Sequence, residues 1–161
     1  MKRLWFIVWI VASVLTGSIT LAQNTPFAPC GIADDIAYPI ESINTRTLNR
    51  GFDDFGLYRA RWEGYHTGID VGFFQAGTVI RAAARGRVTL ADPTEWDEQR
   101  GVVVIEHIFP DNARYYTLYG HVEEGIDVLL PSVDTCVELG DPIGVIGAPT
   151  LSAPHLHFEI R

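Results

Sequence analysis

The amino-acid sequence predicts an all-β fold, a compact antiparallel domain of the β-sandwich or barrel-like kind. Beyond residue 50, apolar residues fall into short runs rich in valine, isoleucine and tyrosine, which favour strands. No window keeps its apolar residues at the helical period of about 3.6 residues. Glycine, proline and aspartate separate the runs, as is typical of hairpins in sandwiches and barrels.

We predict that residues 1–22 are a signal peptide, which precedes the folded domain in the sequence. Lys2 and Arg3 stand before an apolar run from Leu4 to Leu15, and small residues then lead to Ala22. A basic start, an apolar core and a small residue at the cut site are the three parts of a secretory signal. The alternative is an uncleaved anchor, because the apolar stretch is just long enough to span a bilayer. Both alternatives predict an exported domain, in the periplasm or in the extracellular space and cell wall, with membrane contact only through an uncleaved N-terminal segment.

Residues 23–50 predict an N-terminal arm or linker that packs against the domain. Prolines recur in this segment, and periodic apolar residues are few. The segment carries Cys30, and the other cysteine of the chain is Cys136. Outside the cytoplasm these two can form a disulfide. Their sequence separation carries no geometric information, so a disulfide and a pair of free thiols both remain open.

We predict that the folded domain spans residues 51–161. Its expected strands are 78–84, 86–91, 101–108, 114–122, 141–146 and 156–160. Turn signals separate several of these runs, for example Asp92-Pro93 and Pro110-Asp111-Asn112.

Charge and composition narrow the classes of function. The net charge of −8 argues against a nucleic-acid partner, because such partners require a cationic protein face. Two cysteines are too few for a disulfide scaffold or a cysteine-only zinc site. The five histidines are therefore the residues best suited to metal or proton chemistry.

His66 and Asp70 stand four positions apart in a segment with glycine at positions 64, 68 and 72. This density of glycine disfavours a helix. In an extended strand the two side chains would share a face but lie about 13 Å apart, at about 3.3 Å per residue, which is too far for one metal ion. A turn at Gly68 would bring the imidazole and the carboxylate together. The alternative is that His66 caps a turn and Asp70 accepts hydrogen bonds from backbone amides.

His155 and His157 alternate in an apolar run, which places both on one face of a predicted strand. Each of two adjacent imidazoles needs a polar partner, so the pair favours metal binding over packing. His121 ends another strand-like run, whereas His107 lies inside a strand and is expected to be structural. An open catalytic zinc site has three protein ligands and a closed structural site has four. The spacing of these residues in the sequence does not show how many of them would bind the metal.

Five motifs, in order along residues 51–161, resemble those of the lysostaphin-type, LytM-like zinc metallopeptidases. They are Gly64 to Asp70, Gly77 to Ala82 with Gly86 to Val88, Thr117 to His121, Gly140 to Gly144, and Pro154 to Glu159. The departures are modest. Leu151-Ser152-Ala153 stands where many members have a serine-threonine-glycine run, and Cys136 falls in a stretch that usually lacks cysteine.

The resemblance implies a zinc endopeptidase that hydrolyses peptide cross-links or stem peptides of bacterial peptidoglycan, with one zinc ion per domain. His66, Asp70 and His157 would hold the zinc ion, and His121 and His155 would remain unligated for proton transfer. Which histidine is the base and which bond is cleaved both stay open. A second hypothesis is a catalytically inactive LytM-like regulator that binds and activates other cell-wall hydrolases, although all five positions are filled here.

Several residues near the motifs have two interpretations. Aromatic residues either line a substrate groove or pack inside the domain: Trp62, Tyr65, Trp96 and Tyr119. Glu159 shares a strand face with His157 and either supports it from behind or stands in solvent. Members of the family usually continue past this strand, whereas the sequence stops at Arg161. We therefore expect a domain truncated at its C-terminal end, with a last strand that frays or lacks a neighbour.

Overall fold

The computed structural model describes residues 29–41 and 55–161. The predicted signal peptide, residues 1–22, lies outside the described residues, as do residues 23–28 and 42–50 of the predicted arm. Within the two described ranges, no helix has both the length and the apolar character needed to cross a membrane.

The described residues form strands and two single-turn 3-10 helices. In order along the chain they are β1 (Tyr58–Arg59), η2 (Ala60–Trp62), β2 (Gly64–Tyr65), β3 (Ile69–Val71), β4 (Val79–Arg81), β5 (Gly86–Asp92), η3 (Asp97–Gln99), β6 (Gly101–Ile108), β7 (Arg114–Glu123), β8 (Cys136–Val137), β9 (Pro142–Ile146) and β10 (Leu156–Ile160).

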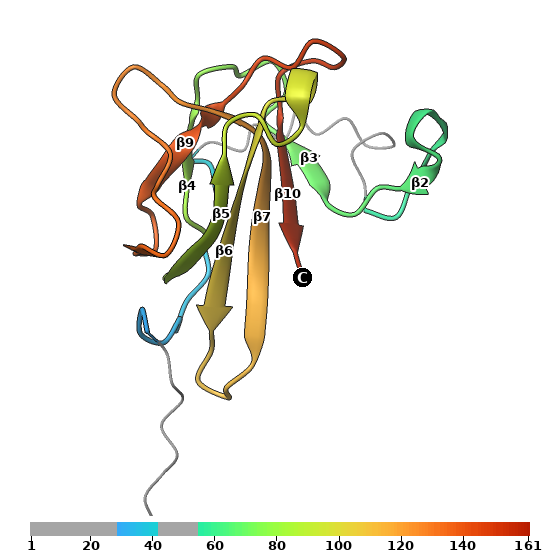
Figure 1. Cartoon of the computed structure of the whole chain (residues 1–161). Helices are drawn as coiled ribbons and strands as arrows, with labels where there is room; N and C mark the ends of the chain where they lie inside the picture. The colour runs from blue at the N-terminus through green and yellow to red at the C-terminus, as the bar shows by residue number, and fades with distance from the viewer. Residues whose placement is uncertain (1–28, 42–54) are drawn as a thin grey trace, which may run out of the picture.

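One antiparallel sheet of eight strands forms the body of the domain (Figure 1). Its main path runs β3-β10-β7-β6-β5-β8, and β9 joins it by pairing with both β7 and β4. β1 and β2 form a separate hairpin that projects beside β3 (Figure 1). The predicted all-β antiparallel fold is confirmed, and the six predicted runs correspond to β4, β5, β6, β7, β9 and β10. The remaining strands are two or three residues long, too short to show an alternating pattern.

Inward-facing side chains from the strands of the sheet, β4 and β9 included, form one hydrophobic core. Tyr119 of β7 and Ile146 of β9 are fully buried in it. The Tyr119 hydroxyl accepts a hydrogen bond from the backbone N–H of Ala83 at 2.7 Å. Burial raises the pKa of this phenol to about 12. Tyr119 therefore packs inside the domain and does not line a groove.

His107 of β6 is also buried, and both of its ring nitrogens have partners. Its Nδ1–H donates to the carbonyl oxygen of Arg85 at 2.8 Å, and Nε2 accepts from the hydroxyl of Thr117 at 2.7 Å. Burial lowers the pKa of this imidazole. These contacts agree with the structural role that its position inside a strand predicts.

Residues 29–41, which belong to the predicted arm, lie against the domain. The N–H of Ala33 donates to the carbonyl oxygen of Ile108 at 2.8 Å, and the N–H of Ala37 donates to that of Ala83 at 2.7 Å. Backbone pairing of this kind ties an irregular segment to the domain, because each bond satisfies a polar group on both sides.

A disulfide joins Cys30 of this segment to Cys136 of β8, with the two Cα atoms 5.3 Å apart. Ile40, farther along the same segment, is buried in the core. Of the two alternatives that the sequence left open, the structure contains the disulfide. A disulfide of this kind is typical of an oxidising compartment outside the cytoplasm.

β10 carries the last motif and lies inside the sheet, paired with β3 on one side and β7 on the other. The backbone of Arg161 still exchanges two hydrogen bonds with that of Tyr116, each 2.9 Å long. The expectation that this strand lacks a neighbour was wrong, because the sheet order places it between two strands. Truncation of the domain stays a prediction.

Candidate metal centre and active site

Asp70 and His157 face each other across two neighbouring strands. β3 and β10 pair with Asp70 directly opposite His157. Directly opposite residues share a face of the sheet, with Cβ atoms about 5 Å apart. Adjacent positions on the same strands, Val71, Leu156 and Phe158, belong to the core cluster. The register therefore sends both polar side chains to the face that is not the core.

His66 reaches the same face because the chain passes very close to β10 at Gly68. A Cβ added to Gly68 would lie 2.4 Å from the carbonyl oxygen of Phe158 and 2.9 Å from Nε2 of His157. Glycine alone permits this approach. Of the two sequence alternatives for the motif, the structure has the one in which the imidazole of His66 and the carboxylate of Asp70 meet.

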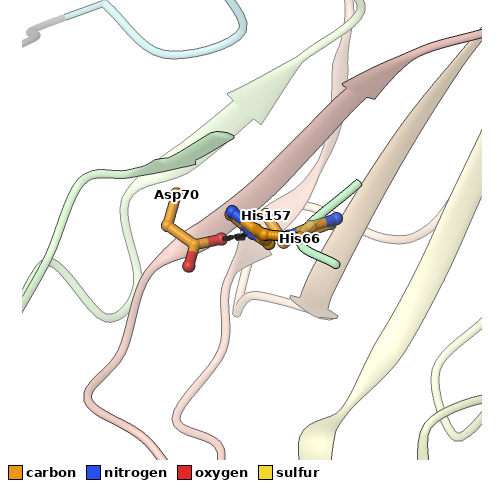
Figure 2. A group of neighbouring side chains, drawn as sticks. All are labelled: His66, Asp70 and His157. Carbon is orange, nitrogen blue, oxygen red and sulfur yellow. Dashed lines mark hydrogen bonds and ion pairs between the residues drawn. The ribbon is translucent and has the colours of Figure 1, made fainter. Parts of the chain in front are cut away.

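Three candidate ligand atoms converge at this point (Figure 2). Nε2 of His66 lies 3.0 Å from Oδ1 of Asp70 and 2.9 Å from Nδ1 of His157. Nδ1 of His157 lies 3.0 Å from the same Asp70 oxygen. All three residues are buried. Figure 2 shows the aspartate and the two imidazoles directed toward one another.

Glu159 supports His157 from behind. Its Oε1 accepts hydrogen bonds from Nε2–H of His157 at 2.8 Å and from the hydroxyl of Thr67 at 2.6 Å. Its other oxygen accepts from the guanidinium of Arg161. Glu159 is only 3% exposed, so the interpretation as a solvated carboxylate was wrong. The bond to Nε2–H fixes the tautomer of His157 in which Nδ1 carries a lone pair.

This donor set fits a zinc ion. Two imidazole nitrogens and one carboxylate oxygen are the ligands of an open catalytic zinc site. Nδ1 of His157 and Oδ1 of Asp70 lie 3.0 Å apart, so a cation bound by both atoms would take the place of the proton that they share in a hydrogen bond. The side chains that the sequence proposed as ligands thus have the chemistry and the proximity that zinc requires.

A β-bulge directs His121 toward the same face. Gly120 and Val122 pair with consecutive residues of β6, so His121 is the extra residue, and its φ is 61°. Strict alternation after Gly120 would send this side chain toward the core, whereas the bulge turns it back. Nδ1–H of His121 donates to the carbonyl oxygen of Gln99 at 2.7 Å. The other ring nitrogen of His121, Nε2, therefore remains available on the side of the cleft.

Trp96 covers this side of the site. Its ring centroid lies 5.2 Å from that of His121 and 5.8 Å from that of His157. A Cβ added to Gly120 would lie 2.2 Å from the indole, so the glycine makes room for it. Trp96 therefore combines the two roles that the sequence offered as alternatives, packing against the histidines and lining the cleft.

His155 stands immediately before β10 and beside His121. Its Nδ1–H donates to the carbonyl oxygen of Ala153 at 2.6 Å, and its ring stacks on Phe73 with centroids 4.9 Å apart. The ring centroids of His155 and His121 are 4.4 Å apart. Nε2 of His155 lies 3.5 Å from Oδ1 of Asp70. All five site residues expected from the sequence are thus gathered in one place.

Burial and neighbouring groups shift the pKa values in this cluster. Burial would raise the pKa of Asp70, but hydrogen bonds with His155 and His157 outweigh it and hold that pKa well below its usual range. Burial opposes protonation of His157, yet bonds to Asp70 and Glu159 raise its pKa. For Glu159 the bonds overcome burial and lower the pKa to about 2. Burial, reinforced by the nearby His155, lowers the pKa of His121 to about 4.

Arg59 of β1 is a site residue that no sequence motif marks. Its Nη2 donates to Oδ2 of Asp70 at 3.3 Å and lies 3.4 Å from Nδ1 of His66. The guanidinium therefore holds the carboxylate oxygen that does not face the histidines. Phe73, which stacks on His155, is equally unmarked. Only the packing of the hairpin and of the segment after β3 brings these two residues to the site.

A cleft of about 710 Å³ opens over the cluster. One wall comes from the β1–β2 hairpin and includes Arg59, Arg61, Trp62 and Tyr65. The opposite part of the lining comes from the segment before β6 and includes Glu95, Trp96, Asp97 and Gln99. Trp62 is 60% exposed and Tyr65 is 71% exposed, so both line the groove and neither packs in the interior.

Solved structures share this fold. One is a zinc-containing peptidase from Vibrio cholerae, with a TM-score of 0.56 and 24% sequence identity. The alignment covers 80% of this chain and 37% of the peptidase chain. The catalytic domain of the antimicrobial peptidase lysostaphin from Staphylococcus simulans aligns with 74% of this chain and 86% of its own, with a TM-score of 0.53 and 26% identity.

Sequence comparison leads to the family. The murein hydrolase activator EnvC of Escherichia coli (strain K12) is 38% identical over 103 residues, which cover 63% of this chain and 21% of the activator. The chain thus spans about a fifth of the length of this curated relative. The pattern of Peptidase family M23 matches residues 64–161, more than half of the chain. Together with the fold and the gathered motif residues, this match shows that the chain belongs to peptidase family M23.

Proposed function

We propose that the protein is a zinc-dependent endopeptidase that hydrolyses peptide cross-links or stem peptides of bacterial peptidoglycan. One observation carries the proposal. His66, Asp70 and His157 bring a complete set of zinc ligands together at the bottom of a cleft, and two further histidines stand beside them. Family membership and the likeness to the lysostaphin catalytic domain support the same activity.

In this proposal, His66, Asp70 and His157 hold one zinc ion. Zinc, when bound, polarises the scissile carbonyl and makes a water molecule nucleophilic near neutral pH. Arg59 and Glu159 keep the ligands in place, because each holds the side of Asp70 or His157 that faces away from the other ligands.

His121 and His155 carry the proton transfer. Each commits its Nδ1–H to a backbone carbonyl oxygen, so the neutral ring presents an unprotonated Nε2. Such a nitrogen accepts a proton from the attacking water, and the resulting imidazolium returns it to the leaving amine. The neighbouring ring and Trp96 restrict the room for bulk water.

The proposal is tested with the full chain, expressed with its own N-terminus in a host that exports it. We expect about one zinc ion per chain by elemental analysis and release of soluble peptides from purified peptidoglycan. A chelator is expected to stop the release, and added zinc to restore it. A folded protein that binds no zinc would contradict the proposal.

A second candidate is a catalytically inactive regulator of other wall hydrolases. The 38% identity to a murein hydrolase activator favours it. In the same assay, a regulator would release nothing alone but would stimulate a separate wall hydrolase, with or without the chelator. The complete histidine and aspartate set makes the endopeptidase the function that the geometry supports best.

We further propose that the domain acts outside the cytoplasm, in the periplasm or at the cell wall. The disulfide between Cys30 and Cys136 supports export, because such bonds persist in oxidising compartments. Protease accessibility of the domain in intact cells and in cells with a permeabilised outer layer tests this location.

A further inference from the structure

The two walls of the cleft carry unpaired charges of opposite sign. On the hairpin wall, Arg61 is exposed and forms no ion pair with any described residue. Its guanidinium lies over the ring of Trp62, 5.2 Å from the ring centroid, which holds the cation along the wall. Glu63, the acidic residue of the same hairpin, is not part of the cleft lining.

The opposite wall is acidic. Glu95 and Asp97 are exposed, line the cleft and form no ion pair within the described part of the chain. They flank Trp96, whose ring packs on His121 and His157. This packing fixes the segment against the sheet, so the two carboxylates keep a defined place beside the histidines.

The sheet order puts the candidate metal centre between these walls. The hairpin leads into β3, the strand on one side of β10, whereas the acidic segment joins β5 to β6 beyond β7 on the other side. The remaining charged lining residues have partners of their own, since Arg59 pairs with Asp70 and Arg161 with Glu159.

Building on the proposed function, we propose that the cleft selects a peptide with a free carboxylate on the hairpin side and a free ammonium group on the η3 side. A stem peptide that contains a diamino acid has both groups. An uncharged oligoglycine cross-link has neither and leaves both walls without partners. Separated charges of opposite sign select the register of the ligand as well as its identity.

The experiment compares four substrates with the full, zinc-loaded chain. They are a cross-linked peptide dimer from peptidoglycan with free carboxylates and a free diamino-acid amine, the same dimer with its carboxylates amidated, the same dimer with its amine acetylated, and pentaglycine whose N-terminus is acetylated and whose C-terminus is amidated. We expect the unmodified dimer to have a KM lower by about threefold to fivefold than either modified dimer, as expected for partly exposed ion pairs.

Matched variants assign the preference to the walls. Arg61→Gln is expected to remove the preference over the amidated dimer alone. The double variant Glu95→Gln with Asp97→Asn is expected to remove the preference over the acetylated dimer alone. Arg85→Gln, which breaks an exposed ion pair with Glu138 outside the cleft, is the control and should leave both preferences unchanged.

Equal KM values for the charged and modified dimers, or better cleavage of pentaglycine, would overturn the inference while leaving the peptidase intact. If no substrate is cleaved, the proposed endopeptidase activity fails, and calorimetric binding of the same peptides decides the inference separately. Tighter binding of the unmodified dimer, lost in Arg61→Gln, would support charge selection. Equal binding of all four peptides would overturn it.

Discussion

At the scale of single residues, His157 shows how the surroundings of a side chain decide its chemistry. Its two ring nitrogens have different partners. Nε2–H donates a hydrogen bond to Glu159, whereas Nδ1 faces His66 and Asp70. His121 and His155 have the reverse arrangement, with Nδ1–H committed to the backbone and Nε2 available. The same residue type thus serves as a candidate ligand or as a candidate base according to its hydrogen-bond partner.

This difference predicts distinct effects of two alanine variants. His157→Ala removes a proposed ligand and should lower zinc content and activity together. His121→Ala should abolish peptide release, by a factor of about 10²–10⁴ for loss of a general base, while zinc content stays near one per chain. Elemental analysis and the peptidoglycan assay on the same samples measure both. Loss of zinc in His121→Ala would contradict the ligand assignment.

Glu159→Gln tests the support behind His157. The amide can still accept from Nε2–H, but it is neutral and turns one of its two acceptor positions into a donor. We expect zinc affinity to fall by about tenfold to a hundredfold, as for other residues that orient a ligand histidine. Competition with a chromophoric chelator gives the dissociation constant. Glu138→Gln, at an exposed ion pair, is the control, and equal affinity in both variants would show that Glu159 does not orient the ligand.

At the scale of elements, β6 carries a buried carboxylate clamped by its neighbours. Glu106 is 5% exposed and accepts hydrogen bonds from Arg87 of β5 and from Arg114 and Tyr116 of β7. The bond from Arg87 lowers the pKa of Glu106; burial opposes this, and Arg114 and Tyr116 reinforce it. The clamp joins three adjacent strands of the sheet, β5, β6 and β7.

This clamp makes stability depend on pH in a defined direction. Because the folded-state pKa of Glu106 is depressed, its contribution is complete above the ordinary glutamate pKa of about 4.3 and is lost as pH falls through the folded value. Glu106→Gln should therefore lower the free energy of unfolding by about 1–3 kcal/mol at neutral pH and by less in acid. Urea unfolding at several pH values measures the difference. Glu41→Gln, at an exposed pair with Arg81, should show little change at any pH.

At the scale of the whole molecule, the disulfide closes a loop of 106 positions and ties the N-terminal segment to β8. Cross-linking a long loop removes conformational freedom from the unfolded chain. The double variant Cys30→Ser with Cys136→Ser should lose about 2–5 kcal/mol of stability. Thermal unfolding with and without reductant measures this loss. Reductant should lower the melting temperature of the parent chain but not of the variant, and an unaffected parent would contradict the prediction.

The strand runs of the sheet could be predicted because their signal is local. Residues 101–108 and 114–122 show strand-forming residue types and turn signals at their ends, and they form β6 and β7. β1, β2 and β3 escaped prediction because each has only two or three residues. Arg59 escaped for another reason, since its contact with Asp70 depends on how the hairpin packs and not on any motif.

By itself, the sequence determined the all-β class and the alternating positions of His155 and His157 in an apolar run, because backbone preference and alternation act between near neighbours. It left open whether the chain brings His66 and Asp70 together at Gly68. Resemblance to a family, not spacing, supplied the number of candidate ligands. Only the tertiary structure decided that His157 meets Asp70 and His66, which lie 87 and 91 positions away, that the cysteines pair, and that Glu159 is buried behind His157. Such contacts depend on strand register and on packing across the sheet, and these are settled only when the whole domain folds.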